Sequence, residues 1–176
     1  DYLSADQAAT VTVDYTMSDD TEAASSSTTM ITITGTNDGP VAVADVAETS
    51  ENKTVTIDVL ANDTDVDADD GPANFSLDTV SVPVGQGSVD IVDNKLVFNP
   101  GTDFDYLSAD QAATATVAYA KSDHTEAASS STTMITVTGT NDAPVANVDN
   151  VSTTEDSSVV VDVLDNDNLV DLSDTH

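Results

Sequence analysis

The chain has 176 residues, and its 33 acidic side chains outnumber the 3 basic ones, which gives a formal net charge of -30. This charge repels nucleic acid and anionic membrane surfaces, and it calls for either compensating cations or a high-salt environment. Cysteine is absent, which excludes a disulfide framework and thiol chemistry. Apolar residues make up 39% of the chain and alternate with polar ones, which argues against a disordered acidic chain.

Alternating apolar and polar residues predict strands along most of the sequence, and helix signals are nearly missing. Between residues 39 and 142 we expect seven strands, at about 41–47, 54–60, 75–82, 87–93, 95–99, 112–121 and 131–138. Turn-formers separate them: 48–52 is expected to be a turn, and Asp93-Asn94 a tight hairpin. We assign 105–113 to a loop that could hold one short helix. Seven short strands in about 100 residues predict an all-β, Ig-like Greek-key sandwich.

The sequence also repeats itself. Gly35-Thr36-Asn37-Asp38-Gly39-Pro40 recurs as 139–144, and residues 1–38 differ from 105–142 at only six positions. The six differences are Val11/Ala115, Asp14/Ala118, Thr16/Ala120, Met17/Lys121, Asp20/His124 and Ile33/Val137. A period near 100 residues suits a tandem array of independent domains. We therefore predict one complete repeat at 39–142, the C-terminal part of a preceding repeat at 1–38, and the N-terminal part of a following repeat at 143–176.

The predicted core of the complete repeat consists of the inward-facing apolar residues of its strands. These are Val55, Ile57, Val59, Leu77, Val80, Val89, Ile91, Leu96, Phe98, Tyr106, Val117, Tyr119, Ile135 and Val137. The partial repeats 1–38 and 143–176 lack complementary strands, so we expect them to be disordered or held by neighbouring molecules.

Acidic side chains are expected to gather at the joints between domains. If strands alternate in direction, the loop 61–73, with five aspartates, lies beside the linker Asn37-Asp38. At the opposite end, the turn with Glu51, the loop 103–105 and the next linker should meet the following copy. Hard cations such as Ca²⁺ need six to eight oxygen ligands, and these loops supply them. The alternative is that the aspartates only form soluble turns. The candidate metal ligands are Asn37, Asp38, Glu51, Asp63, Asp65, Asp67, Asp103, Asp105, Asn141, Asp142, Glu155, Asp167 and Asp171.

The pattern of these joints resembles a known family. Asn-Asp-x-Pro linkers, Pro40-Val41-Ala42 and the run Asp58 to Asp67 look like the cadherin-like, VCBS-type tandem repeats of giant bacterial surface proteins, such as extender regions of RTX adhesins. The resemblance implies a cadherin-like sandwich with calcium shared between domains, the linker Asn141-Asp142 binding together with Glu51, Asp103 or Asp105, and Asp167. An EF-hand is not matched, since Ala68 and Asn74 replace its glycine and its last glutamate.

The resemblance and the charge favour an extracellular structural extender on a bacterial cell surface. Its partners would be calcium ions and neighbouring copies joined end to end, without nucleic acid or membrane insertion. The alternative is a ligand-binding adhesin domain, for which the threonine-rich strand 132–138 is the candidate surface. We expect no enzyme: the two histidines, His124 and His176, form no zinc pattern, and no serine-nucleophile or phosphate-binding motif occurs. An isopeptide bond, considered for Lys95, is the least favoured interpretation.

Overall fold

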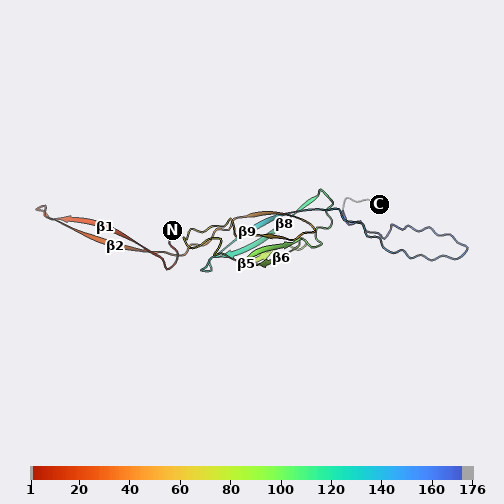
Figure 1. Ribbon diagram of the computed structural model, residues 1–176, viewed down its shortest axis with the longest axis horizontal. Coiled ribbons are helices and arrows are strands. Elements are labelled where there is room, and N and C mark those ends of the chain that lie inside the picture. Colours follow the sequence, from red (N-terminus) through yellow and green to blue (C-terminus); the bar gives the residue numbers. More distant parts are fainter. Residues whose placement is uncertain (1, 172–176) are drawn as a thin grey trace. The chain divides into compact units, whose positions relative to one another are not determined.

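The computed structural model describes residues 2–171, and all of its regular structure is β-strand. The strands are β1 (Ala8–Ser18), β2 (Ala24–Thr34), β3 (Asp45–Ser50), β4 (Val55–Ile57), β5 (Ser76–Ser81), β6 (Ser88–Val92), β7 (Lys95–Asn99), β8 (Ala112–Ser122) and β9 (Ala128–Thr138) (Figure 1). Within this range no helix is long and apolar enough to cross a membrane. The described residues divide into two compact units, the first made of 2–43, 60–78 and 120–130, and the second of 44–59, 79–119 and 131–171.

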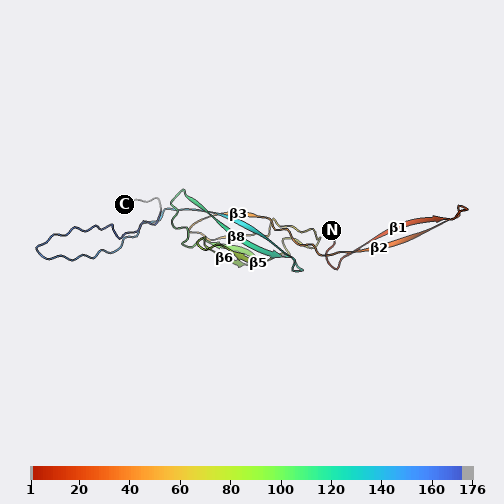
Figure 2. The ribbon, with the colours of Figure 1, turned by 180° about the vertical axis from the view of Figure 1, so that it is seen from behind.

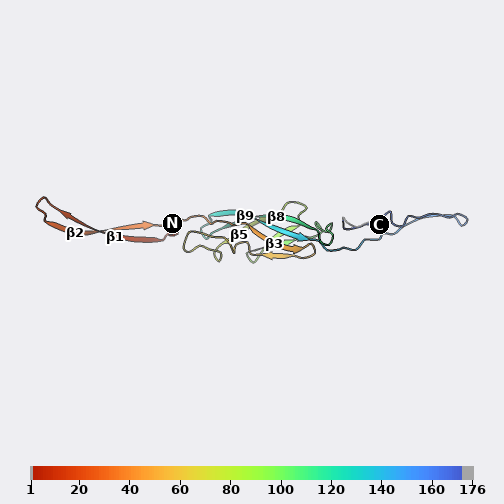
Figure 3. The same ribbon diagram turned by 90° about the horizontal axis from the view of Figure 1, so that it is seen from above.

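The strands form an Ig- or cadherin-like sandwich, which confirms the predicted fold class. One sheet has the order β3-β9-β8-β5 and the other the order β4-β7-β6. β3 runs parallel to β9, with Asp45 opposite Thr133 and Ser50 opposite Thr138. The long strands β8 and β9 lie side by side (Figures 1 and 3), and β3 follows in the same sheet (Figure 2).

The apolar core lies mainly in the second unit. Its fully buried side chains include Leu96, Phe98 and Ile135, and the rings of Phe98 and Phe104 meet edge to face at 6.4 Å between centroids. Of the predicted core, eight residues are buried: Val59, Leu77, Leu96, Phe98, Val117, Tyr119, Ile135 and Val137. Val55, Ile57, Val80 and Val89 are half-buried. The assignment was wrong for Ile91 and Tyr106, which are 38% and 40% exposed. Leu60, Phe75, Phe104, Leu107 and Ala115 are buried instead.

The predicted hairpin at Asp93-Asn94 is confirmed. Val92 pairs with Lys95, and the two turn residues have φ of 50° and 60°. A two-residue turn with both φ values positive matches the right-handed twist of the strands on either side. Asn and Asp are the non-glycine residues that accept this conformation most readily.

Elsewhere the strand boundaries differ from the prediction because side chains take up backbone groups. The expected strand 41–47 begins only at Asp45, since the N–H of Ala42 donates to Ser129 Oγ and the N–H of Val43 donates to Asp63 Oδ1. β3 then continues to Ser50, through part of the expected turn 48–52. The expected strand 54–60 shortens to β4. Residues 105–111 form turns and no helix, with Asp110 at a φ of 69°.

The N-terminal partial copy, which we expected to be disordered or held by neighbouring molecules, forms a two-stranded hairpin. β1 and β2 pair in register over eleven residues each, from Ala8 opposite Thr34 to Ser18 opposite Ala24 (Figure 1). The side chains of Val13, Tyr15 and Ile33 are nevertheless 45–48% exposed, whereas the identical or similar residues of β8 and β9 are buried. In residues 143–171 the pairing is confined to a single bridge between Val145 and Asn168.

Candidate metal centre

The first linker is tied to the acidic loop 61–73 by backbone hydrogen bonds within the first unit. The N–H of Asp38 donates to Asp67 Oδ2 at 2.9 Å, and the N–H of Val43 donates to Asp63 Oδ1 at 2.7 Å. Between these two contacts, Val41 and Thr64 form an antiparallel bridge. The structure therefore places the loop beside the linker, and it leaves Asp67 Oδ1 buried without a hydrogen-bond donor among the described residues.

The turn between β8 and β9 brings in an acid outside the predicted ligand set, Asp123. Its Oδ1 accepts the N–H groups of Thr125 and Ala127 at 2.8 and 2.9 Å, and its Oδ2 accepts Nδ2 of Asn37 at 3.0 Å. Burial opposes ionisation of this carboxyl, but the hydrogen bonds from Asn37, Thr125 and Ala127 outweigh it and lower the pKa of Asp123. The carboxylate is thus kept charged at the linker.

Three carboxylates converge beside this linker. Asp65, Asp70 and Asp123 each offer an oxygen within 4.8 Å of the other two. Four side-chain oxygens at this place are buried and accept no hydrogen bond from any described residue: Asn37 Oδ1, Asp65 Oδ2, Asp67 Oδ1 and Asp70 Oδ2. Buried oxygens without donors are rare in native proteins, and carboxylates brought this close repel one another. A hard divalent cation would satisfy both conditions at once, so the residues fit such an ion.

Two basic side chains also face the acidic loop. Lys121 Nζ lies 3.1 Å from Asp63 Oδ2, and both side chains are fully buried. His124 Nδ1 lies 2.6 Å from Asp70 Oδ1. In the same loop, Asp69 accepts a hydrogen bond from Ser4 Oγ. The centre is therefore bordered by positive or donor groups, while the oxygens of Asn37, Asp65 and Asp67 remain available.

The second linker, in the second unit, is held in a different way by Glu51. Glu51 Oε1 accepts both the N–H and the hydroxyl of Thr140, each at 2.5 Å, while Oε2 is buried without a donor among the described residues. The N–H of Gly139 donates to the carbonyl of Gln111 at 2.9 Å. A Cβ on Gly139 would lie 2.4 Å from the carbonyl oxygens of Leu107 and Ser108. The glycine thus permits a close backbone approach.

Beyond Thr140 the second linker repeats the hydrogen bonds of the first. The N–H of Asp142 donates to Asp171 Oδ2 at 3.2 Å, and the N–H of Asn147 donates to Asp167 Oδ1 at 2.8 Å. Asp171 Oδ1 is buried without a donor in the described range, as is Asp67 Oδ1 at the first linker. Asp63, Asp67, Asp167 and Asp171 therefore each hold one backbone N–H, and Asp67 and Asp171 keep their other oxygen buried without a donor among the described residues.

Among the described residues, the other predicted ligands are not brought into a group of three acids. Asp103 is exposed, and its Oδ2 accepts the N–H of Gly87 at 2.7 Å. Asp105 is half-buried in the turn 101–106, and Glu155 and Asn141 are exposed. Asp70 and Asp123, which were not among the predicted ligands, both recur at the repeat distance, as Asp174 and Asp19. That recurrence in the sequence was the signal that could have identified both aspartates as candidate ligands.

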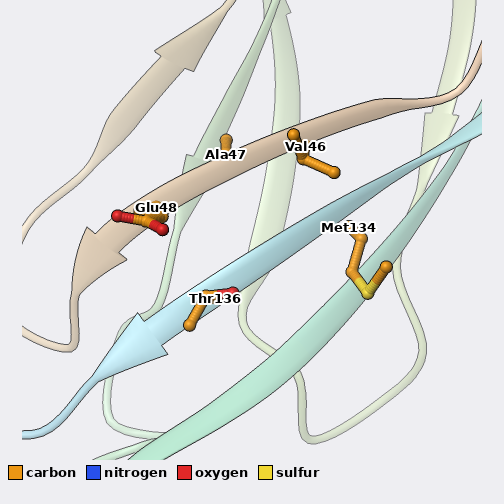
Figure 4. A pocket seen from close by; sticks show the side chains of 5 residues that line it. All are labelled: Val46, Ala47, Glu48, Met134 and Thr136. Carbon is orange, nitrogen blue, oxygen red and sulfur yellow. The ribbon is translucent and has the colours of Figure 1, made fainter.

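A shallow hollow of about 330 Å³ lies on the outer face of β3 and β9 within the second unit (Figure 4). Val46, Ala47 and Glu48 of β3 and Met134 and Thr136 of β9 line it. Val46 and Met134 are 79% and 52% exposed. Glu48 is the one ionisable side chain in its lining, so the hollow offers no acid–base pair.

Comparison with known proteins places the chain in a family. No curated protein matches it. Among solved structures, extracellular cadherin domains 1–4 of protocadherin gamma B7 share 20% identity over 86% of this chain and 38% of that one, with a TM-score of 0.39. The extracellular domain of protocadherin gamma B4 shares 18% identity over 84% of this chain and 25% of that one, with a TM-score of 0.43. Mouse clustered PcdhgC3 EC1–3 shares 16% identity over 82% of this chain and 47% of that one, with a TM-score of 0.38. The chain thus spans less than half the length of these proteins.

Bacterial Ig domains match residues 37–138, more than half of the chain, and the protein belongs to the bacterial Ig domain family.

Proposed function

We propose that the chain is part of a structural extender of a large secreted bacterial surface protein, in which calcium stiffens the joints between successive domains. The observation that carries this proposal is the set of buried oxygens without donors at the first linker, where Asn37, Asp67 and Asp123 meet. These oxygens come from the linker and the acidic loop, and the carboxylate of Asp123 in the β8–β9 turn lies beside them. An ion held by all three would fix the linker to the domain that follows it.

The ligands would come from segments that are far apart in sequence. Asn37 would contribute its amide oxygen, and Asp65, Asp67, Asp70 and Asp123 would contribute carboxylates. Bound calcium supplies positive charge that offsets the repulsion among these carboxylates. At the second linker, Glu51 Oε2 and Asp171 Oδ1 are the corresponding free oxygens. Affinity should be on the order of 10⁻⁴–10⁻³ M, as in other extracellular modules.

Scattering from a protein of three complete repeats, with calcium and then with chelator, tests the proposal. Calcium should lengthen and narrow the distribution of maximum dimensions, because fixed joints hold neighbouring domains in line. Calcium titration by calorimetry on the present chain tests binding directly. A chain that takes up no calcium at millimolar concentration, together with an unchanged scattering curve, would exclude this function.

Ligand binding is the second candidate, and the exposed apolar hollow around Val46 and Met134 is the observation that favours it. An extender needs no such surface. Saturable binding of a glycan or protein ligand by the isolated 39–142 repeat, abolished by Val46→Glu, would support the binding function. Binding that persists in Val46→Glu would place the ligand elsewhere.

A further inference from the structure

Lys121 is the buried cation of the first unit. Its Nζ lies 3.1 Å from Asp63 Oδ2, off the line of a hydrogen bond, and 3.5 Å from the centroid of the Phe75 ring. Neither side chain of the ion pair is exposed. By contrast, the ion pair of Lys95 with Asp58 is 44% and 47% exposed. A buried carboxylate that loses its only nearby cation is strongly destabilising, so Lys121 and Asp63 depend on each other.

The other copy of this strand lacks the cation. Met17 occupies the position of Lys121, although the two copies differ at only six of 38 positions. Three of those differences change charge, Asp14/Ala118, Met17/Lys121 and Asp20/His124, and each makes the complete copy less acidic. Lys121 and His124 both contact the acidic loop, at Asp63 and Asp70. Two of the three charge differences between the copies therefore lie at the candidate metal centre.

We propose that Lys121 is a tethered counter-ion, which neutralises Asp63 and lets this repeat fold without calcium, whereas a repeat with methionine at this position needs calcium to hold the same carboxylate. The first half of the inference stands on the ion pair alone, and the second half rests on the proposed calcium function. Asp63 is accordingly not a calcium ligand in this repeat, because it pairs with Lys121 instead. An array of both kinds of repeat would lose stability in stages as calcium is removed.

The test is Lys121→Met in the full chain, with thermal unfolding followed in chelator and in calcium. Methionine fills the same space and keeps a favourable contact with Phe75, so the substitution removes mainly the charge. In chelator the midpoint should fall by about 10 °C or more, since Asp63 is left buried and unpaired. Lys121→Met with Asp63→Asn should recover most of that loss, because an amide needs no counter-ion and can still accept the N–H of Val43. Lys95→Met is the matched control, and it should shift the midpoint by only about 2 °C.

Calcium should raise the midpoint of Lys121→Met more than that of the wild-type chain. If the wild-type chain binds no calcium, the proposed function fails, and the chelator measurements still decide the role of the ammonium group. A Lys121→Met chain as stable in chelator as the wild type would overturn the inference. So would a double variant that stays as unstable as Lys121→Met, because the loss would then come from packing. A wild-type mass lower by one water, located to Lys121 and Asp63, would reveal an isopeptide bond between these two side chains. That bond would also overturn the inference, because the lysine nitrogen would then be a neutral amide and could not act as a counter-ion.

Discussion

Asn37 in the first linker donates a hydrogen bond of 3.0 Å to Asp123 in the β8–β9 turn, although 86 residues separate them in the chain. Nδ2 of Asn37 also donates to the carbonyl of Asp38 at 2.6 Å, so both contacts use the same end of the amide. The orientation of the side chain is thereby fixed, and Oδ1 is directed to a buried place without a donor among the described residues. The hydrogen bonds of the linker thus present one of its own oxygens to the centre.

Asp123→Asn should weaken calcium binding by at least about tenfold, measured by calorimetry. The substitution removes one carboxylate charge, and its amide would meet the amide group of Asn37. The matched control is Asp19→Asn. Asp19 forms the same turn, accepting the N–H groups of Thr21 and Ala23 at 2.8 and 3.0 Å, but lies fully exposed. Equal affinity in both variants would remove Asp123 from the centre.

Phe98→Ala should lower the free energy of unfolding by about 3–5 kcal/mol, measured by urea denaturation. The ring is fully buried and meets Phe104 edge to face, so its removal leaves a cavity in the core of the second unit. Val84→Ala serves as the control because Val84 is fully exposed, and it should change stability by no more than about 0.5 kcal/mol. A loss below about 1 kcal/mol for Phe98→Ala would mean that the core is not built around this ring.

Strand periodicity was enough to predict the fold, because alternation marks the buried face wherever strands pair regularly. Leu96, Phe98, Val117 and Ile135 were found in this way. The pattern failed where loops bury side chains. Phe104 and Leu107 lie in irregular segments, which have no period, so Tyr106 was selected and Leu107 was missed.

The candidate centre was predicted only in part for a related reason. The position of the loop 61–73 beside Asn37 follows from the alternation of strand directions. Which aspartate pairs its second oxygen with a cation, as Asp63 does with Lys121, and which keeps that oxygen available, as Asp67 does, depends on the local path of the chain. Asp123 belongs to a turn 86 residues away from Asn37, and only the pairing of β8 with β9 brings it there.

Gly139→Ala should destabilise the protein by about 1–3 kcal/mol, because the new Cβ would lie 2.4 Å from two backbone carbonyl oxygens that cannot move aside easily. Gly39→Ala is the matched control. Its Cβ would meet only the Cβ of Ala127, at 3.8 Å, and the second linker has Ala143 at the equivalent position. Urea denaturation of both variants should show a loss for Gly139→Ala alone. Two neutral substitutions would show that the Leu107–Ser108 backbone is not clamped against the linker.

His124 should titrate above its ordinary pKa of about 6.5 in the calcium-free protein. The hydrogen bond from the ring to Asp70 favours the imidazolium and raises the pKa of His124, with further contributions from the charges of Asp70, Asp69 and Asp123. A folded-state pKa above the unfolded one means that protonation adds stability. This contribution is complete below about pH 6.5, and it is lost as the pH rises through the folded-state pKa of His124.

The measurement is an NMR titration of His124 in chelator, with the urea-unfolded chain as reference. Asp70→Asn should bring the folded-state pKa most of the way back to the unfolded one, because it removes the largest cause of the shift. Asp58→Asn is the control, since Asp58 pairs with Lys95 instead. If the pKa of His124 in the wild-type chain equals that in urea, the ring does not bind the Asp70 carboxylate in solution, and His124 does not belong to the surroundings of the acidic centre.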